Sequence, residues 1–523
     1  MTIAPAATLS PVARWEFGFL SAAILVSLAL GFANLGAPSI WHDEAIHLYA
    51  TESILTTGLP YLPSGYLYTA GLPYHYLLAP VVALFGRSEA VIRAPSVLMA
   101  AVNLGLLYFI ARQFLGRPTA VIAVVLLCVS PWQTAWARET NFYMLHQTLF
   151  LLFFAAAWKT VEATDRTQAV RWGAATGAAY LFGGLTTIQT ILFLGPVGAY
   201  AAVMALFTRS LRSRYGVAAL VAAVAVAITL VVYVAALPQA EKDVVFKEGG
   251  IGGQTASQMI DRDRSDLFYY PRFLSNNLSL GYLIAAAAGF VWMCACEKKR
   301  GLYWMVHFVL PVAALTLLLG YKQHRFMFYC YPLYVGACAH GLVQLARFVA
   351  DTARAVARPA AVPPLHRAWR VAAAAVIALF GARLAVSTGK LATATFATAS
   401  GSHTTLAKQH PQWREPSLWV KERMDGAAVI ATAYLPVHYY TGRVDNWFPS
   451  RVMVWEILDS GMEGLKTIDD LKAFMNEHPK GYFLADYRRF HQWPFFQDDV
   501  RWVEENMTKV DEASTEDVTV YAW

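Results

Sequence analysis

Two adjacent carboxylates, Asp43 and Glu44, follow directly on the first long apolar segment of the chain, in the sequence Trp41-His42-Asp43-Glu44. An ionised carboxylate is costly to hold at the boundary of a bilayer, so acidic residues at such a position point to function. A carboxylate there can remove the proton of an attacking hydroxyl group. The alternative is that both residues are only the solvated exit of a helix, because charged residues often flank membrane spans.

Basic residues from three separate segments, with an acid and a tyrosine beside them, are predicted to approach the same face of the membrane. They are Arg93 at the start of one span, Arg138, Glu139 and Tyr143 around the start of another, and Lys322, His324 and Arg325 just before a third. Each basic residue alone is explained equally well as a side chain that reaches from a span end to the interface. Together, one acidic point and several cations suit a reaction whose leaving group is a phosphate.

The segment 37–89, which carries the two carboxylates, is long and rich in tyrosine. One interpretation is a belt of aromatic side chains at the membrane–water interface. The other is that short helices lie along the surface and wall a groove for carbohydrate or lipid, with Tyr74 and His75 as candidate groove residues. The stretch 77–85 is apolar but too short to span a bilayer, which fits an in-plane helix.

A membrane must hold these residues in place, because 57% of the chain is hydrophobic and only 15% is charged. Several apolar runs exceed the roughly 20 residues that cross a bilayer as a helix. The apolar stretch 172–207 is too long for one helix, and Gly183-Gly184 with Thr186-Thr187 predicts a turn within it. We expect about eleven spans: 15–36, 90–111, 118–136, 142–160, 170–187, 188–207, 215–237, 279–296, 302–320, 326–346 and 368–388.

The charges of the loops predict the orientation. One set of alternate loops is consistently basic and is expected in the cytoplasm. The opposite loops, among them 37–89 and 238–278, mix both signs, so we expect Asp43 and Glu44 on the extracytoplasmic face of a multi-pass protein of the cell (inner) membrane. The basic loops also account for much of the net charge of +7, and no nucleic-acid partner is inferred from it.

The composition changes near residue 389. Residues 1–388 are expected to form the transmembrane domain, and 389–405, rich in Ala, Thr and Ser, a linker. Beyond the linker, 427–432, 482–485 and 518–522 have the pattern of strands and 468–476 that of an amphipathic helix. We therefore expect a small extracytoplasmic α/β domain over 406–523. All five cysteines lie in or beside predicted spans, so this domain folds without disulfides.

The order of these features resembles the membrane glycosyltransferases of the GT-C class. The likeness is to the branch that contains the protein O-mannosyltransferases and the lipid A aminoarabinose transferases, and it is strongest over 37–160. The sequences that carry it are the Asp-Glu pair, Leu84-Phe85-Gly86-Arg87-Ser88-Glu89, Arg93-Ala94-Pro95-Ser96, Ser130-Pro131 and Ala137-Arg138-Glu139 with Tyr143. The chain departs from the pattern at 71–75, where relatives often have a His-Pro-Pro-like stretch, and His75 is the candidate for that histidine's role.

The resemblance implies a polyprenyl-phosphate-linked sugar as the donor and a hydroxyl group of a lipid, glycan or protein as the acceptor, among membrane lipids. The hydroxyl attacks the anomeric carbon in a single inverting displacement, and the lipid phosphate leaves. Asp43 would be the base or orient the acceptor, and Glu44 would position a neighbouring cation or the acceptor. The donor's phosphate and sugar would be bound by Arg93, Arg138, Glu139, Tyr143, Lys322, His324 and Arg325.

Two alternatives remain open at this point. Carboxylates can hold a divalent metal ion against a phosphate, yet the basic residues can also suffice without one. A transporter or flippase for a lipid-linked sugar would have the same general composition. Transporters tend to place charges and broken helices at mid-membrane in related halves, whereas here the informative charges gather at one face, which favours an enzyme.

Overall fold

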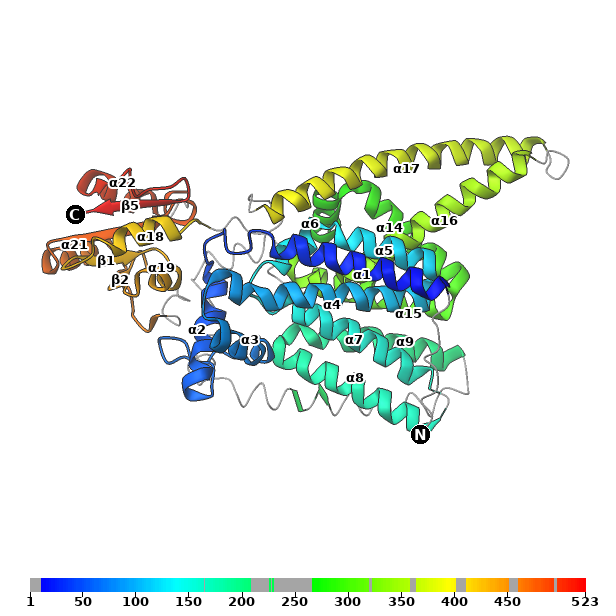
Figure 1. Cartoon of the computed structure of the whole chain (residues 1–523), viewed down its shortest axis with the longest axis horizontal. Coiled ribbons are helices and arrows are strands. Elements are labelled where there is room, and N and C mark those ends of the chain that lie inside the picture. Colours follow the sequence, from blue (N-terminus) through cyan, green and yellow to red (C-terminus); the bar gives the residue numbers. More distant parts are fainter. Residues whose placement is uncertain are drawn as a thin grey trace.

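The computed structural model describes residues 11–163, 165–207, 225, 226, 228, 229, 266–318, 322–357, 364–400, 411–450, 460–492 and 496–523. The described part is mainly helical, with a bundle of long helices and a small sheet near the C-terminus (Figure 1). Most of the expected span 215–237 and residues 238–265 of the loop 238–278 lie outside the described residues.

The helical bundle is built from elements on both sides of the undescribed segment. Those before it are α1 (Pro11–Phe32), α4 (Glu89–Leu115), α5 (Arg117–Cys128), α6 (Pro131–Ala137), α7 (Tyr143–Val161), α8 (Arg166–Thr186), η1 (Ile188–Phe193) and α9 (Leu194–Phe207). Those after it are α13 (Tyr269–Leu274), η3 (Ser275–Ser279), α14 (Leu280–Trp292), η4 (Met293–Glu297), α15 (Lys299–Leu318), η5 (His324–Cys330), α16 (Tyr331–Ala357) and α17 (Pro364–Ala399).

Seven helices among the described residues are long and apolar enough to span a membrane, or up to eight if the bent pair α5 and α6 forms one span. The chain is therefore an integral membrane protein, as expected. The number of eleven spans is not confirmed by this count. The stretch 172–207 does divide at the predicted threonines, since α8 ends at Thr186 and η1 begins at Ile188, but Gly183 and Gly184 lie within α8 and not in a turn.

The bundle is held together by close approaches at small residues. A Cβ atom added to Gly289 on α14 would collide with the carbonyl oxygen of Ala337 on α16, and one on Gly341 would collide with that of Ala285. Such contacts are typical of membrane helices, which gain their association energy from close packing rather than from the removal of apolar surface from water.

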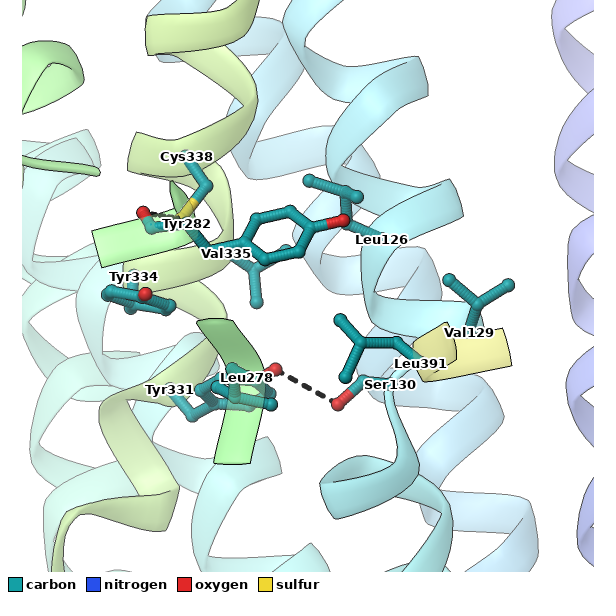
Figure 2. A pocket seen from close by; sticks show the side chains of 10 residues that line it. All are labelled: Leu126, Val129, Ser130, Leu278, Tyr282, Tyr331, Tyr334, Val335, Cys338 and Leu391. Atoms are coloured by element: carbon teal, nitrogen blue, oxygen red, sulfur yellow. Dashed lines mark hydrogen bonds between the residues drawn. The ribbon is translucent and has the colours of Figure 1, made fainter. Parts of the chain in front are cut away.

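The pocket drawn in Figure 2 lies inside this bundle and is too small to hold a sugar. Tyr282, Tyr334 and Cys338 lie around it, and the hydroxyl groups of Ser130 and Tyr331 form a hydrogen bond of 2.9 Å at its side. Its volume is about 20 Å³, room for roughly one water molecule. Sites for larger ligands are usually ten or more times this volume, about 300–1,000 Å³.

Two shorter helices, α2 (His42–Thr57) and α3 (Leu72–Phe85), follow α1. They lie at the end of the bundle that faces the C-terminal domain, which we call the Asp43 end (Figure 1). Residues 77–85 are helical as predicted, as the second part of α3. Gly71 precedes α3 with φ of 81°, and a Cβ there would press on the ring of Phe142, so the chain turns into this helix only with glycine.

The C-terminal domain contains a five-stranded sheet with the order β2-β1-β3-β5-β4. Strand β1 pairs in parallel with β2 and β3, whereas β5 is antiparallel to β3 and β4. The strands are β1 (Ala428–Ala431), β2 (Asn446–Trp447), β3 (Gly481–Asp486), β4 (Thr508–Lys509) and β5 (Val518–Ala522). The helical elements are α18 (Arg414–Lys421), α19 (Tyr434–Thr441), α21 (Ile468–Glu477), η7 (Tyr487–His491) and α22 (Gln497–Asn506). The predicted strands and the predicted amphipathic helix are all present.

The segment 389–405, expected to be a linker, is helical over most of its length because α17 continues to Ala399. Alanine is the strongest helix former, and threonine can satisfy its hydroxyl group inside a helix. Thr393, Thr395 and Thr398 each donate to the carbonyl oxygen four residues earlier. The segment expected as a linker is therefore part of helix α17 from residue 389 to Ala399.

Candidate active site

Asp43 lies in the first turn of α2, with its side chain 29% exposed. Its Oδ2 atom accepts a hydrogen bond of 3.1 Å from Nη1 of Arg325, which lies in η5 and is 19% exposed. Two of the residues singled out in the sequence, 282 positions apart, are thus in direct contact. An acid and a cation stand side by side at the Asp43 end, and both have access to solvent.

Glu44 differs sharply from its neighbour, since it is completely buried. Its Oε1 atom accepts from Nε of Arg93 at 2.7 Å and from the backbone N–H of Thr140 at 2.8 Å. Its Oε2 atom accepts from Nη2 of Arg93 at 2.6 Å and from the backbone N–H of Trp41 at 3.0 Å. The last bond caps α2, so Glu44 ties the start of α2 to α4 and to the turn after α6.

Arg93, one of the residues predicted to bind the phosphate, uses all five of its N–H groups within the protein. Besides Glu44, it donates through Nη1 and Nη2 to the carbonyl oxygens of Leu35, Pro38 and Ser39, at 2.9 to 3.0 Å. Only 2% of its surface is exposed. Arg93 therefore holds the segment between α1 and α2 in the position that the structure describes.

Arg138 is also engaged with carbonyl oxygens. It donates to those of Leu30, Gly31, Ala33 and Asn34, at the end of α1 and just beyond it. The last carbonyl groups of a helix have no partner within the helix and carry partial negative charge, so an arginine there both caps the helix and balances its dipole. The fork of Arg138 thus points to α1.

The remaining basic residues lie in or beside η5. Lys322 is 2% exposed. The ring of His324 stacks on Phe273 at 4.8 Å and lies 6.5 Å from the ring of Trp136, which packs against Tyr143 at 4.7 Å. Tyr143 and His324 therefore lie on either side of Trp136 in one neighbourhood. Glu139 is 5% exposed, in the turn between α6 and α7.

Tyr74 and His75 are both fully buried on α3. The hydroxyl group of Tyr74 forms a hydrogen bond of 3.1 Å with that of Ser96 on α4. Nε2 of His75 forms a hydrogen bond of 2.8 Å with Nδ1 of His47 on α2. These two residues join α3 to its neighbouring helices.

His47 was missed in the sequence, although it follows Asp43 by one helical turn, and residues four apart share a helix face. Burial lowers the pKa of His47 to about 4, although Asp43 and Glu44 both act to raise it. Burial, and next the neighbouring His47, lower the pKa of His75 well below its usual range. The pair is therefore neutral at pH 7.

An apolar groove of about 480 Å³ lies beside α3. It is lined by Leu72, Pro73, Tyr76, Leu77, Leu145, Leu149, Phe182 and Leu185 from α3, α7 and α8. Tyr74 and His75, the predicted groove residues, are not among them. This lining suits a hydrocarbon chain far better than a sugar, whose hydroxyl groups need hydrogen-bond partners.

No group of three or more His, Cys, Asp or Glu residues is arranged to hold a metal ion within the part of the chain that the structure describes.

Comparison with known proteins agrees with the resemblance seen in the sequence. The family model described as dolichyl-phosphate-mannose-protein mannosyltransferase matches residues 71–234. The structure is similar to that of ArnT from Cupriavidus metallidurans bound to undecaprenyl phosphate, with a TM-score of 0.64 and 13% identity over 99% of this chain and 98% of that one. No curated protein matches the sequence significantly.

A second similar structure is the oligosaccharyltransferase AglB from Archaeoglobus fulgidus in complex with an inhibitory peptide and a dolichol-phosphate. Its TM-score is 0.58 at 13% identity, over 97% of this chain and 74% of that one. The family match and the shared fold confirm the resemblance to the GT-C class. The matched family is described as a mannosyltransferase and AglB as an oligosaccharyltransferase, which favours membrane glycosyl transfer over the transporter alternative.

Proposed function

We propose that the protein transfers a sugar from a polyprenyl-phosphate donor to an acceptor hydroxyl group, on the extracytoplasmic face, by one inverting displacement. The observation that carries the proposal is the contact between Asp43 and Arg325, an accessible acid beside an accessible cation. The undecaprenyl phosphate bound to ArnT and the dolichol-phosphate bound to AglB support a lipid-linked donor.

In this proposal the donor's phosphate takes Arg325 as its partner, with Lys322 and His324 nearby. The guanidinium fork matches phosphate oxygens, and fixed cations stabilise the charge that grows on the leaving phosphate. Once Arg325 faces the phosphate, its hold on Asp43 weakens. The carboxylate is then available to accept the proton of the acceptor hydroxyl as the bond to the anomeric carbon forms.

We assign Arg93 and Arg138 a positioning role in place of the phosphate binding expected for them, and Glu44 the first of its expected roles, which is to position a neighbouring cation, here Arg93. Glu44 accepts from Arg93 and from the backbone N–H groups of Trp41 and Thr140. Arg93 and Arg138 donate to carbonyl oxygens of the segment from Leu30 to Ser39. This segment leads directly into α2, so they fix the place from which Asp43 projects. Positioning of this kind can contribute a large share of an enzyme's rate acceleration.

The apolar groove beside α3 is proposed to hold part of the donor's isoprenoid chain. Its lining is hydrocarbon and aromatic, and α3 is joined to α2 by the bond between His75 and His47. A chain lying there would keep the phosphate at the end of the molecule where α2 begins. Tyr143, Glu139, Tyr74 and His75 would then shape the surroundings of the sugar.

We further propose that the Asp43 end faces the outside of the inner membrane, in a protein of about eleven spans with the C-terminal domain over 406–523 on the same side. The opposite end of α1 and α4 supports this orientation, because Arg112 and Arg117 meet Glu16 there. Arginine-rich ends are retained in the cytoplasm. A reporter fused after Trp523 should be active outside the cytoplasm, and a cytoplasmic signal would reverse the assignment.

Lipid analysis of cells that lack the protein tests the function directly. We expect a polyprenyl-phosphate sugar to accumulate and one glycan to disappear. The purified protein, given that lipid and its acceptor, should release polyprenyl phosphate and form the product with inverted anomeric configuration. Retention of configuration would contradict the single displacement, and no change in any lipid-linked sugar would contradict the proposed donor.

A further inference from the structure

The C-terminal domain is hydrogen-bonded to the segment that leads into α2, through Arg414 at the start of α18. The backbone N–H of Arg414 donates to Oγ of Ser39 at 2.9 Å. Its guanidinium group donates to the carbonyl oxygens of Gly36, Ala37 and Pro38, at 2.7 to 3.2 Å. A residue more than 370 positions away thus binds the chain a few residues before Asp43.

Glu89, at the start of α4 in the membrane domain, accepts hydrogen bonds from Arg414 and Tyr440 of the C-terminal domain. Its Oε1 atom accepts from Nε and Nη2 of Arg414, at 3.1 and 2.7 Å. The same oxygen accepts from the hydroxyl group of Tyr440 at 2.7 Å, and that hydroxyl accepts from the backbone N–H of Ile40 at 2.8 Å. The backbone N–H of Ser39 donates to Oε1 of Gln412 at 3.3 Å.

Arg93 and Arg414 together occupy every carbonyl oxygen from Leu35 to Ser39. Arg93 comes from the membrane domain and is paired with Glu44, whereas Arg414 comes from the C-terminal domain and is paired with Glu89. Both domains therefore share the task of fixing one short piece of backbone.

Apolar packing and side-chain contacts join the domains over the same region. Ile40 and Leu48 belong to one buried cluster with Leu435 and Val437 of α19. The hydroxyl group of Tyr49 on α2 forms a hydrogen bond of 2.5 Å with Nδ1 of His438. Helix α2, which carries Asp43, thus contacts the C-terminal domain in its middle, at Leu48 and Tyr49.

We propose that the C-terminal domain is a positioning element of the transfer reaction, and that Arg414 and Tyr440 are its positioning residues. They fix 36–40 and thereby set the place and orientation of Asp43 relative to Arg325. The proposal rests on the proposed function, because it assigns the domain a part in the same site. It does not require any contact of the domain with the donor.

The kinetic test compares Arg414→Ala and Tyr440→Phe with Arg423→Ala in the full-length purified protein. Arg423 is in the same domain, exposed, and bonded locally to Trp419 and Glu422, so it is a matched control. We expect kcat on the folded fraction to fall by about tenfold or more in the first two, as losing hydrogen bonds to a charged group implies, with KM for the donor little changed. Arg414→Lys should recover part of kcat, because the charge on Glu89 keeps a partner.

Amide hydrogen exchange gives a readout that does not depend on activity. The backbone N–H groups of Ser39 and Ile40 donate directly to the C-terminal domain, so their exchange should accelerate in Arg414→Ala and Tyr440→Phe and stay unchanged in Arg423→Ala. Unchanged exchange, or an unchanged kcat on the folded fraction of both variants, overturns the proposal. If the wild-type protein transfers no sugar from any polyprenyl phosphate, the proposed function fails, while the exchange data still decide whether the domain fixes the segment.

Discussion

The guanidinium group of Arg93 and the carboxylate of Glu44 form two parallel hydrogen bonds, of 2.7 and 2.6 Å, with both side chains at most 2% exposed. This bidentate geometry uses the shape of arginine as well as its charge. Neither group reaches water, so each charge can be buried only because the other compensates it. The pair joins α4 to the start of α2.

Arg93→Ala should therefore destabilise the protein strongly, by about 3–5 kcal/mol, because it leaves the charge of Glu44 buried without its partner. Unfolding of the purified variant in detergent would measure this. The matched control is Arg354→Ala, which breaks a pair whose side chains are 78% and 71% exposed. That change should cost less than about 1 kcal/mol, and equal effects in the two variants would contradict the structural role of Arg93.

Asp43→Asn should abolish transfer while leaving the fold nearly intact, since the side chain is partly exposed and the amide is of similar size. Loss of a positioned base typically lowers a rate by about a hundred- to ten-thousand-fold. Glu52→Gln is the control, because Glu52 lies on the same helix with similar exposure, 28%, and pairs with Arg87. Near-normal turnover by Asp43→Asn would remove Asp43 from the mechanism.

Arg325→Ala and Arg138→Ala should have opposite signatures, although both remove an arginine at the Asp43 end. We expect Arg325→Ala to weaken binding of a polyprenyl phosphate by about tenfold or more, in line with a lost hydrogen bond to a charged group, and Arg325→Lys to recover part of it. Arg138→Ala should lower the unfolding temperature, because α1 loses its cap, with affinity per folded molecule unchanged. Affinity for the polyprenyl phosphate, measured on the folded fraction, separates the two variants. If only Arg138→Ala lost affinity, Arg138 and not Arg325 would be the phosphate-binding residue.

Stability should fall as the pH drops from about 6.5 towards 4, because His47 and His75 are buried in the neutral form. The unfolded chain binds protons near the usual histidine pKa of about 6.5, whereas the pKa of His47 in the folded protein is about 4. Between these values the unfolded state holds more protons, so the free energy of unfolding rises with pH and is greatest above 6.5. Unfolding temperatures at pH 7.5 and pH 5 measure the slope, which should be smaller in His47→Gln. An equal slope in that variant would assign the dependence to other groups.

The meeting of Asp43 and Arg325 was foreseeable, because the alternation of spans brings both to one face of the membrane. The contacts of Arg93 and Arg138 with the backbone could not be foreseen from the sequence. An arginine at a span end can face a ligand or the carbonyl groups of a neighbouring helix, and the sequence around it is the same in both cases. Only the placement of α1 against α4 and α6 decides between them.

The sheet of the C-terminal domain was predictable because short apolar runs such as 427–432 are typical of buried strands and are too short for a buried helix. The contact of Arg414 with Glu89 was not predictable, because it depends on how two separately recognisable domains meet across 325 positions of sequence. The helix α17 was underestimated for a local reason, namely that threonine-rich segments are usually irregular unless each hydroxyl group finds a carbonyl oxygen. The break between α8 and η1 was local as well, and there the prediction was right for Thr186-Thr187 but wrong for Gly183-Gly184, which lie within α8.

The buried cluster that contains Ile40, Leu48, Leu435 and Val437 has a consequence for protein engineering. Chimeras between this protein and others of its fold would ordinarily be cut near residue 405, where the composition changes. Such a cut would separate the two halves of one apolar core and leave Arg414 facing a foreign backbone. The unit that can be exchanged is the C-terminal domain together with residues 35–49 and the start of α4. A C-terminal domain grafted without these residues should be expressed with an exposed apolar face.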